Sequence, residues 1–191
     1  MLRYIPNILT LGRIVLIFPF AYYLLQADYK SALVLFFIAG VSDGVDGFLA
    51  RQFRWKSRFG AIADPLADKL LLMTAYCVLA YTQLLPVWLI LVIVVRDLSI
   101  VAGALGYHFF IHRYEVKPTI WGKLCTFTQI SFVLIMLVNL ALYPLPFDFI
   151  SAGVWLVAII TVMSGVHYAV TWTRRAWQSD HENDQSGSSE Q

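Results

Sequence analysis

Long apolar stretches separated by short polar breaks run along most of the chain. A helix needs about 20 mostly apolar residues to cross a bilayer, and six stretches have this length. They are residues 8–26, 31–52, 61–83, 86–112, 118–142 and 149–173. Charged residues or prolines mark the breaks, such as Asp28 and Lys30 in the first and Pro144 and Pro146 in the last. The pattern predicts an all-α membrane protein, a bundle of six transmembrane helices.

The composition agrees with this pattern. Apolar residues make up 59% of the 191 residues and charged residues 14%, whereas soluble domains carry roughly 25% charged residues. We expect one integral-membrane domain over residues 1–175 and a disordered polar tail over residues 176–191. The first stretch is interpreted as a retained span, because Leu25-Gln26-Ala27 lacks the small residues of a signal cleavage site.

Basic residues gather at alternate breaks between the apolar stretches. One set of breaks and both ends of the chain hold Arg3, Arg13, Arg51, Arg54, Lys56, Arg58, Arg113, Lys117, Lys123, Arg174 and Arg175. The other set holds only Lys30. Because positively charged loops stay in the cytoplasm, we expect a multi-pass protein with both termini inside, as in a bacterial inner membrane.

Four aspartates interrupt the apolar pattern near the cytoplasmic ends of the second and third spans. Positions 43, 46, 47, 50 and 51 follow the i, i+3, i+4, i+7, i+8 spacing of one helix face, and positions 60, 64 and 68 follow it on the next span. The linker over residues 52–59 is short, so the two spans are expected to be antiparallel neighbours with facing stripes.

The chemistry of these aspartates favours a metal site. Several carboxylates at membrane depth repel one another and are costly to bury, whereas Mg²⁺ or Mn²⁺ prefers oxygen ligands. The stripes therefore predict a polar, metal-binding cavity on the cytoplasmic side, suited to a diphosphate. Two alternatives are helix packing through a pair with Lys69 and an ion or proton pathway. A pathway would spread acids across the membrane depth, whereas these acids cluster at one end.

The complete pattern resembles the signature of the CDP-alcohol phosphatidyltransferase family, with every position present. It reads Asp43-x-x-Asp46-Gly47-x-x-Ala50-Arg51, eight residues, then Gly60-x-x-x-Asp64-x-x-x-Asp68. The six-span layout extends the resemblance to residues 3–175. The resemblance implies an enzyme of phospholipid biosynthesis that transfers the phosphatidyl group of CDP-diacylglycerol to an alcohol and releases CMP.

The resemblance also implies roles for individual residues. Asp43, Asp46, Asp64 and Asp68 would be ligands of Mg²⁺ or Mn²⁺, and Asp68 would also be the catalytic base that takes the proton of the acceptor hydroxyl. The nucleotide-binding residues would be Gly47, Ala50, Arg51, Gly60, Asn7 and Arg13. The expected partners are CDP-diacylglycerol, an alcohol acceptor and membrane lipids, with no nucleic acid; a homodimer is left open.

Two further stretches bear on the acceptor alcohol. Arg96 precedes Asp97 deep in the fourth span, where it can form an ion pair with a neighbouring helix or bind substrate. Lys117 and Lys123, in KPTIWGKLCTFTQ, can bind an acceptor phosphate or extend to the membrane interface. Both stretches resemble the cardiolipin-forming branch of the family. We therefore expect phosphatidylglycerol as acceptor, with glycerol-3-phosphate as the alternative.

Overall fold

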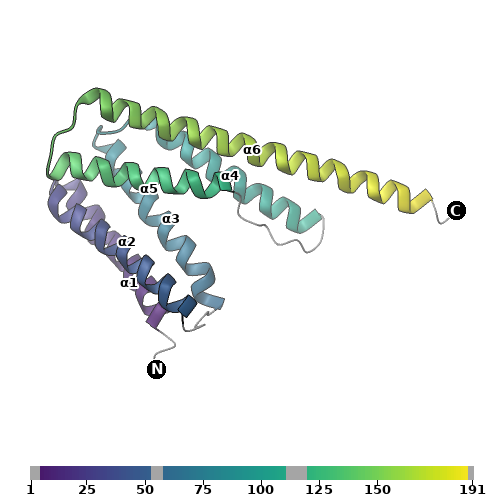
Figure 1. Cartoon of the computed structure of the whole chain (residues 1–191), viewed down its shortest axis with the longest axis horizontal. Helices are drawn as coiled ribbons and strands as arrows, with labels where there is room; N and C mark the ends of the chain where they lie inside the picture. The colour runs from purple at the N-terminus through teal and green to yellow at the C-terminus, as the bar shows by residue number, and fades with distance from the viewer. Residues whose placement is uncertain (1–4, 53–57, 111–119, 189–191) are drawn as a thin grey trace. The chain divides into compact units, whose positions relative to one another are not determined.

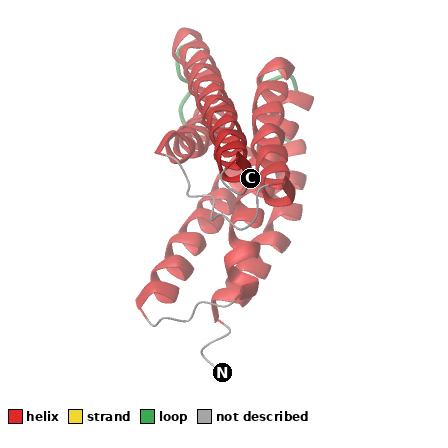
Figure 2. Cartoon of the chain, turned by 90° about the vertical axis from the view of Figure 1, so that its right-hand side faces the viewer, coloured by secondary structure: helices red, strands yellow, loops and turns green. Residues whose placement is uncertain are grey.

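The protein, described as a computed structural model, is all-helical in the residues that the structure describes. These are residues 5–52, 58–110 and 120–188, with side chains described for residues 10–45, 64, 66–103, 120–168 and 170. The helices are α1 (Ile5–Leu25), α2 (Tyr29–Gln52), α3 (Arg58–Tyr81), α4 (Val87–Phe110), α5 (Ile120–Ala141) and α6 (Phe147–Ser188) (Figure 1). Figure 2 shows helices and turns, and no strand, within the described ranges. Each helix overlaps one predicted stretch.

The helices belong to two compact units, which are described separately. The first unit contains residues 1–87 and 129–151, and therefore α1, α2, α3 and the second half of α5. The second unit contains residues 88–128 and 152–191, and therefore most of α4 and most of α6. The four aspartates lie in the first unit and Arg96 in the second.

In the first unit, α1 packs against both α2 and α3. Small side chains make this close packing possible, because Ala32 and Ala39 on α2 and Ala67 on α3 are fully buried. Phe20 of α1 is also fully buried, and the centroid of its ring lies 5.8 Å from that of Phe36 on α2. Helix α1 is therefore held by two neighbours whose sequences carry the acidic stripes.

Two turns of the first unit end their helices in the same way. Ala27 and Gln83 adopt left-handed φ values of 57° and 59°. After each, the chain closes a pair of backbone hydrogen bonds; Asp28 N donates to Tyr23 O at 2.9 Å and Leu84 N to Leu79 O at 2.8 Å. This is the Schellman arrangement, here formed without glycine.

Asp28 then begins α2 as its N-cap. Its carboxylate accepts hydrogen bonds from the hydroxyl of Ser31 at 2.6 Å and from the backbone N–H of Ser31 at 3.3 Å. The hydroxyl bond, followed by the backbone bond, holds the pKa of Asp28 below its usual value. The predicted break at Asp28 and Lys30 is therefore a tight turn that stops one helix and starts the next.

The outer surfaces of the helices are apolar. Phe18 on α1 is 73% exposed and Phe37 on α2 is 62% exposed. Residues Ile120–Ala141 and Phe147–Tyr168 are long and apolar enough, by length and composition, to cross a membrane. Hydroxyl groups on the helices donate to the carbonyl four residues earlier, as Ser99 does to Val95 at 2.6 Å. Exposed apolar side chains as large as Phe18 and Phe37 are costly in water and suit contact with lipid.

Helix α6 extends further than the apolar pattern predicts. The sixth stretch ends at residue 173 and a disordered tail was expected from residue 176, whereas α6 continues to Ser188. No proline interrupts the chain between Phe147 and Ser188, so nothing in the backbone breaks the helical hydrogen bonds. The division into a membrane domain and a separate tail stays a prediction.

Candidate functional site

Helix α1 carries two buried polar side chains, Thr10 and Arg13, on one face. Their spacing of three residues places them side by side, and their exposed fractions are 0% and 1%. A buried guanidinium is stable only with partners that compensate its lost hydration. These partners are aspartates of the acidic stripes.

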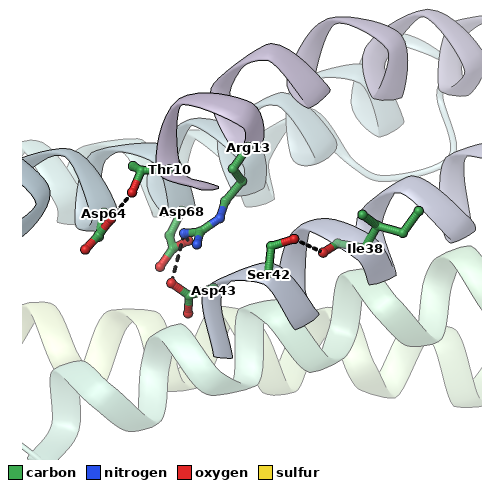
Figure 3. Close-up of polar contacts among 7 residues, drawn as sticks. All are labelled: Thr10, Arg13, Ile38, Ser42, Asp43, Asp64 and Asp68. Atoms are coloured by element: carbon green, nitrogen blue, oxygen red, sulfur yellow. Dashed lines mark hydrogen bonds and ion pairs between the residues drawn. The ribbon is translucent and has the colours of Figure 1, made fainter. Parts of the chain in front are cut away.

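Arg13 joins the two stripes through its guanidinium group. Its Nη1 donates to Oδ1 of Asp43 on α2 at 2.8 Å and to Oδ1 of Asp68 on α3 at 2.5 Å (Figure 3). The arginine side chain is fully buried, but those of Asp43 and Asp68 are 45% and 36% exposed. The cation therefore lies behind a carboxylate pair that stays open on its outer side.

Thr10 makes the neighbouring contact. Its hydroxyl donates to Oδ1 of Asp64, which precedes Asp68 by one helical turn on α3. Three of the four signature aspartates thus meet side chains of α1 at one end of the helix trio. Thr10 was not among the predicted site residues, and Arg13 was predicted only as part of the nucleotide pocket. The available signal was their shared helix face and the cost of burying an arginine.

These contacts connect residues of both stripes to α1, whereas the direct packing of α2 on α3 stays a prediction. Asp43 lies in the second half of α2, and Asp64 and Asp68 lie in the first half of α3. Asp43 and Asp68 both reach Arg13, so at least one residue of each stripe lies at the same point of α1. Gly44 adds space beside Asp43, since a Cβ built on it would meet no neighbouring atom within 4 Å.

The donor chemistry of this region fits a divalent cation. Among the residues with described side chains, no three acidic, histidine or cysteine residues are arranged to hold a metal. Two carboxylate oxygens nevertheless converge on one cationic nitrogen, and carboxylates are the ligands that Mg²⁺ and Mn²⁺ prefer. The fourth predicted ligand, Asp46, lies on α2 with its side chain outside the described set.

The predicted nucleotide-binding residues other than Arg13 also lie outside that set. Their backbones belong to α1, α2 and α3, but nothing of their side chains is described; they are Asn7, Gly47, Ala50, Arg51 and Gly60. The predicted acceptor residue Lys117 lies outside the described residues altogether. Lys123 is described and is exposed on α5.

Arg96 has a built environment in the second unit. It is 7% exposed, its Nη1 donates to Asp97 at 2.8 Å, and its Nη2 donates to the Ser164 hydroxyl of α6 at 2.7 Å. The guanidinium lies 5.8 Å from the centroid of the Tyr168 ring. Within the described residues its Nε has no hydrogen-bond partner. Arg96 thus contacts a neighbouring helix through a hydroxyl group and forms an ion pair with the adjacent residue of α4.

Comparisons with known proteins agree with the signature. The model of the family described as CDP-alcohol phosphatidyltransferase matches residues 3–175. The chain is 40% identical over 116 residues to the cardiolipin synthase (CMP-forming) of Rattus norvegicus. The aligned region covers 60% of this chain and 37% of the rat protein.

Bacterial relatives match over more of their length. The CDP-diacylglycerol–glycerol-3-phosphate 3-phosphatidyltransferase of Bacillus subtilis is 33% identical over 185 residues, 86% of this chain and 92% of that protein. The Aquifex aeolicus protein of the same name is 32% identical over 140 residues, 71% of this chain and 76% of that protein. The chain therefore spans little more than a third of the rat cardiolipin synthase but nearly the whole of the Bacillus protein.

Proposed function

Because the chain belongs to the CDP-alcohol phosphatidyltransferase family, we propose that it transfers the phosphatidyl group of CDP-diacylglycerol to a glycerol-type alcohol and releases CMP. The observation that carries the proposal is the convergence of Asp43 and Asp68, with Asp64 one turn away, at one end of α1, α2 and α3. Membership of the family supports the assignment of these signature residues to the site, and the contacts connect three helices around them.

In the proposed reaction, Asp68 takes the proton of the acceptor hydroxyl. The hydroxyl oxygen forms a bond to the phosphorus that carries the diacylglycerol, and the bond from that phosphorus to the oxygen of CMP breaks. CMP leaves with the electron pair. Asp68 suits this role because its side chain is 36% exposed and reaches the open side of the site. An acceptor hydroxyl can therefore approach it.

Asp43, Asp46, Asp64 and Asp68 would hold the divalent cation, which would neutralise the diphosphate and stabilise CMP as a leaving group. Arg13 carries the positive charge of α1 at the same point and would bind the diphosphate. Gly47, Ala50, Arg51, Gly60 and Asn7 would complete the nucleotide pocket. These assignments follow the signature residue by residue.

We propose that all six helices cross the membrane, with the site facing the cytoplasm. The aspartates lie late in α2 and early in α3, and Thr10 and Arg13 lie early in α1. These positions share one side of the membrane if consecutive helices cross in opposite directions. The exposed apolar side chains support contact with lipid. A membrane location also suits a lipid donor, because the acyl chains of the donor stay in the bilayer. A homodimer stays a prediction.

Phosphatidylglycerol is the proposed acceptor, which would make cardiolipin the product. The similarity to the rat cardiolipin synthase supports this choice, as do the Arg96-Asp97 pair and the segment that contains Lys117 and Lys123. Glycerol-3-phosphate is the second candidate. It is supported by the Bacillus protein, whose similarity extends over 92% of its length.

One experiment tests both the reaction and the acceptor. Purified protein in mixed micelles receives labelled CDP-diacylglycerol with equal amounts of phosphatidylglycerol and glycerol-3-phosphate, and the products are separated by lipid chromatography. We expect CMP and cardiolipin, and we expect both to disappear with a chelator and return with Mg²⁺ or Mn²⁺. Phosphatidylglycerol phosphate as the product would reverse the choice of acceptor.

The same preparation separates the enzyme from the ion-pathway alternative. In sealed liposomes an ion pathway would give a flux of protons or cations without any release of CMP. Release of CMP that depends on an acceptor and on a divalent cation, without such a flux, supports the transferase. No CMP with either acceptor would refute it.

A further inference from the structure

The position of Arg13 between two carboxylates has a parallel in metal sites. One nitrogen atom, Nη1, contacts Oδ1 of Asp43 and Oδ1 of Asp68 at 2.8 and 2.5 Å. The two oxygens come from different helices and share this one positive partner (Figure 3). Asp43 and Asp68 would hold a divalent cation through carboxylate oxygens, the ligand type that Mg²⁺ and Mn²⁺ prefer.

We infer that Nη1 of Arg13 occupies the bridging position in the metal-free protein, and that metal binding displaces it from Asp43 and Asp68. The inference rests on the metal site of the proposed function. Arg13 is thus a positioning residue with two states. In one it neutralises the carboxylate pair, and in the other it is released from that pair.

Charge and space both prevent the two cations from sharing this position. A guanidinium nitrogen beside a divalent cation is repelled by it, and the repulsion is strong where burial excludes water. Arg13 is 1% exposed, so little water is available to screen it. The N–H groups of Nη1 also point at the same oxygens that the metal would bind.

Thr10 allows the exchange without separating the helices. Its hydroxyl contact with Asp64 involves no charge on α1, and α1 remains packed against α2 and α3 through Phe20 and its apolar neighbours. The guanidinium can therefore turn while the backbone of α1 stays in place. A released arginine is then free to bind the diphosphate of the donor, so metal binding should favour nucleotide binding.

The test measures metal binding without any substrate. Mn²⁺ binding to the purified protein is followed by electron paramagnetic resonance for the wild type, Arg13→Gln and Arg13→Lys. We expect Arg13→Gln, which removes the competing charge, to bind Mn²⁺ at least tenfold more tightly, or about 1.4 kcal/mol. Arg13→Lys keeps the charge and should stay close to the wild type. Lys30→Gln is the control, since Lys30 lies 13 residues before Asp43 on α2, roughly 20 Å along the helix.

Thermal unfolding adds a second readout. In chelator, Arg13→Gln should unfold at a lower temperature than the wild type, because its carboxylates lack their cation. Saturating Mn²⁺ should then raise its unfolding temperature by more than it raises that of the wild type. Mn²⁺ affinity in Arg13→Gln equal to or below that of the wild type would overturn the inference, because Arg13 would then support the metal site rather than compete for it.

A measurement on the wild type does not depend on folding of a variant. Phenylglyoxal modifies accessible arginines, and mass spectrometry locates the modified peptide. We expect modification of Arg13 to be slow in chelator and several-fold faster with Mn²⁺, while that of Arg96, buried in the second unit, stays constant. Unchanged or slower modification of Arg13 would contradict displacement. Neither measurement requires phosphatidyl transfer. A protein that releases Arg13 on metal binding but makes no CMP would therefore refute the proposed function and not this inference.

Discussion

Replacing Asp68 by asparagine separates the chemistry of the site from its stability. Asparagine has the same shape, and its Oδ1 can still accept the hydrogen bond that Nη1 of Arg13 now donates to Asp68 at 2.5 Å. The contact of Arg13 with Asp43 at 2.8 Å is unaffected. The change therefore removes one negative charge and one proton acceptor while the connection between α1 and α3 remains.

The expected cost in stability is small. The loss is the difference between a charge-assisted and a neutral hydrogen bond, about 1 kcal/mol, and water at the 36% exposed Asp68 side chain reduces it further. Relief of repulsion from Asp43 and Asp64 acts in the opposite direction. The free energy of unfolding should thus change by no more than about 1 kcal/mol. The loss of a general base should slow transfer at least about 100-fold, which raises the activation free energy by about 2.7 kcal/mol.

The assay compares CMP release and thermal unfolding for Asp68→Asn and for the control Asp28→Asn. Asp28 is the N-cap of α2, and asparagine caps a helix about as well as aspartate. The control should keep both activity and stability. If a folded Asp68→Asn protein releases CMP at more than a tenth of the wild-type rate, Asp68 is not the base.

Three further predictions concern α2 and its first turn. Gly44→Ala should stabilise α2 by up to about 1 kcal/mol, because the new Cβ meets no atom within 4 Å. It should nevertheless slow transfer at least tenfold if a ligand approaches the backbone at Gly44, and full activity of the variant would show that no ligand does so. Ala27→Gly should raise stability by about 0.5–1 kcal/mol in thermal unfolding, because φ is 57°; an unchanged or lower unfolding temperature would speak against strain at this position. A single cysteine at position 28 should react with an impermeant label only from the non-cytoplasmic side, and labelling from the cytoplasm would reverse the proposed topology.

Local patterns predicted the helices and the acidic stripes. The lengths of the apolar stretches and the breaks at Asp28 and Pro144 determined where helices begin and end, because both signals act within a few residues. The facing of α2 and α3, expected from their short linker, stays a prediction, although both helices pack against α1. These features depend on neighbours in sequence, which a single chain displays directly.

The contacts of α1 could not be predicted in that way. Thr10 reaches Asp64 over 54 residues, and Arg13 reaches Asp68 over 55. Periodicity shows that Thr10 and Arg13 share a face, but which helix covers that face depends on tertiary packing. Arg96 illustrates another limit. Adjacent residues on a helix do not normally face each other, so an ion pair with another helix or a contact with substrate was expected. The ion pair is instead with the adjacent Asp97, and the contact with another helix is the hydroxyl of Ser164.

The buried arginine of α1 also sets a problem for biosynthesis. During translation Arg13 is made 30 residues before Asp43 and 55 residues before Asp68, an interval of several seconds at about 5–20 residues per second. In a lone first helix its charge would cost about 2.5–3.5 kcal/mol at the centre of the bilayer. Its place near the start of α1 lets the long side chain reach the cytoplasmic interface meanwhile. Helix α1 can therefore insert before α2 and α3 are made. Arg13 would become buried only when the carboxylates of α2 and α3 are in place to bind it.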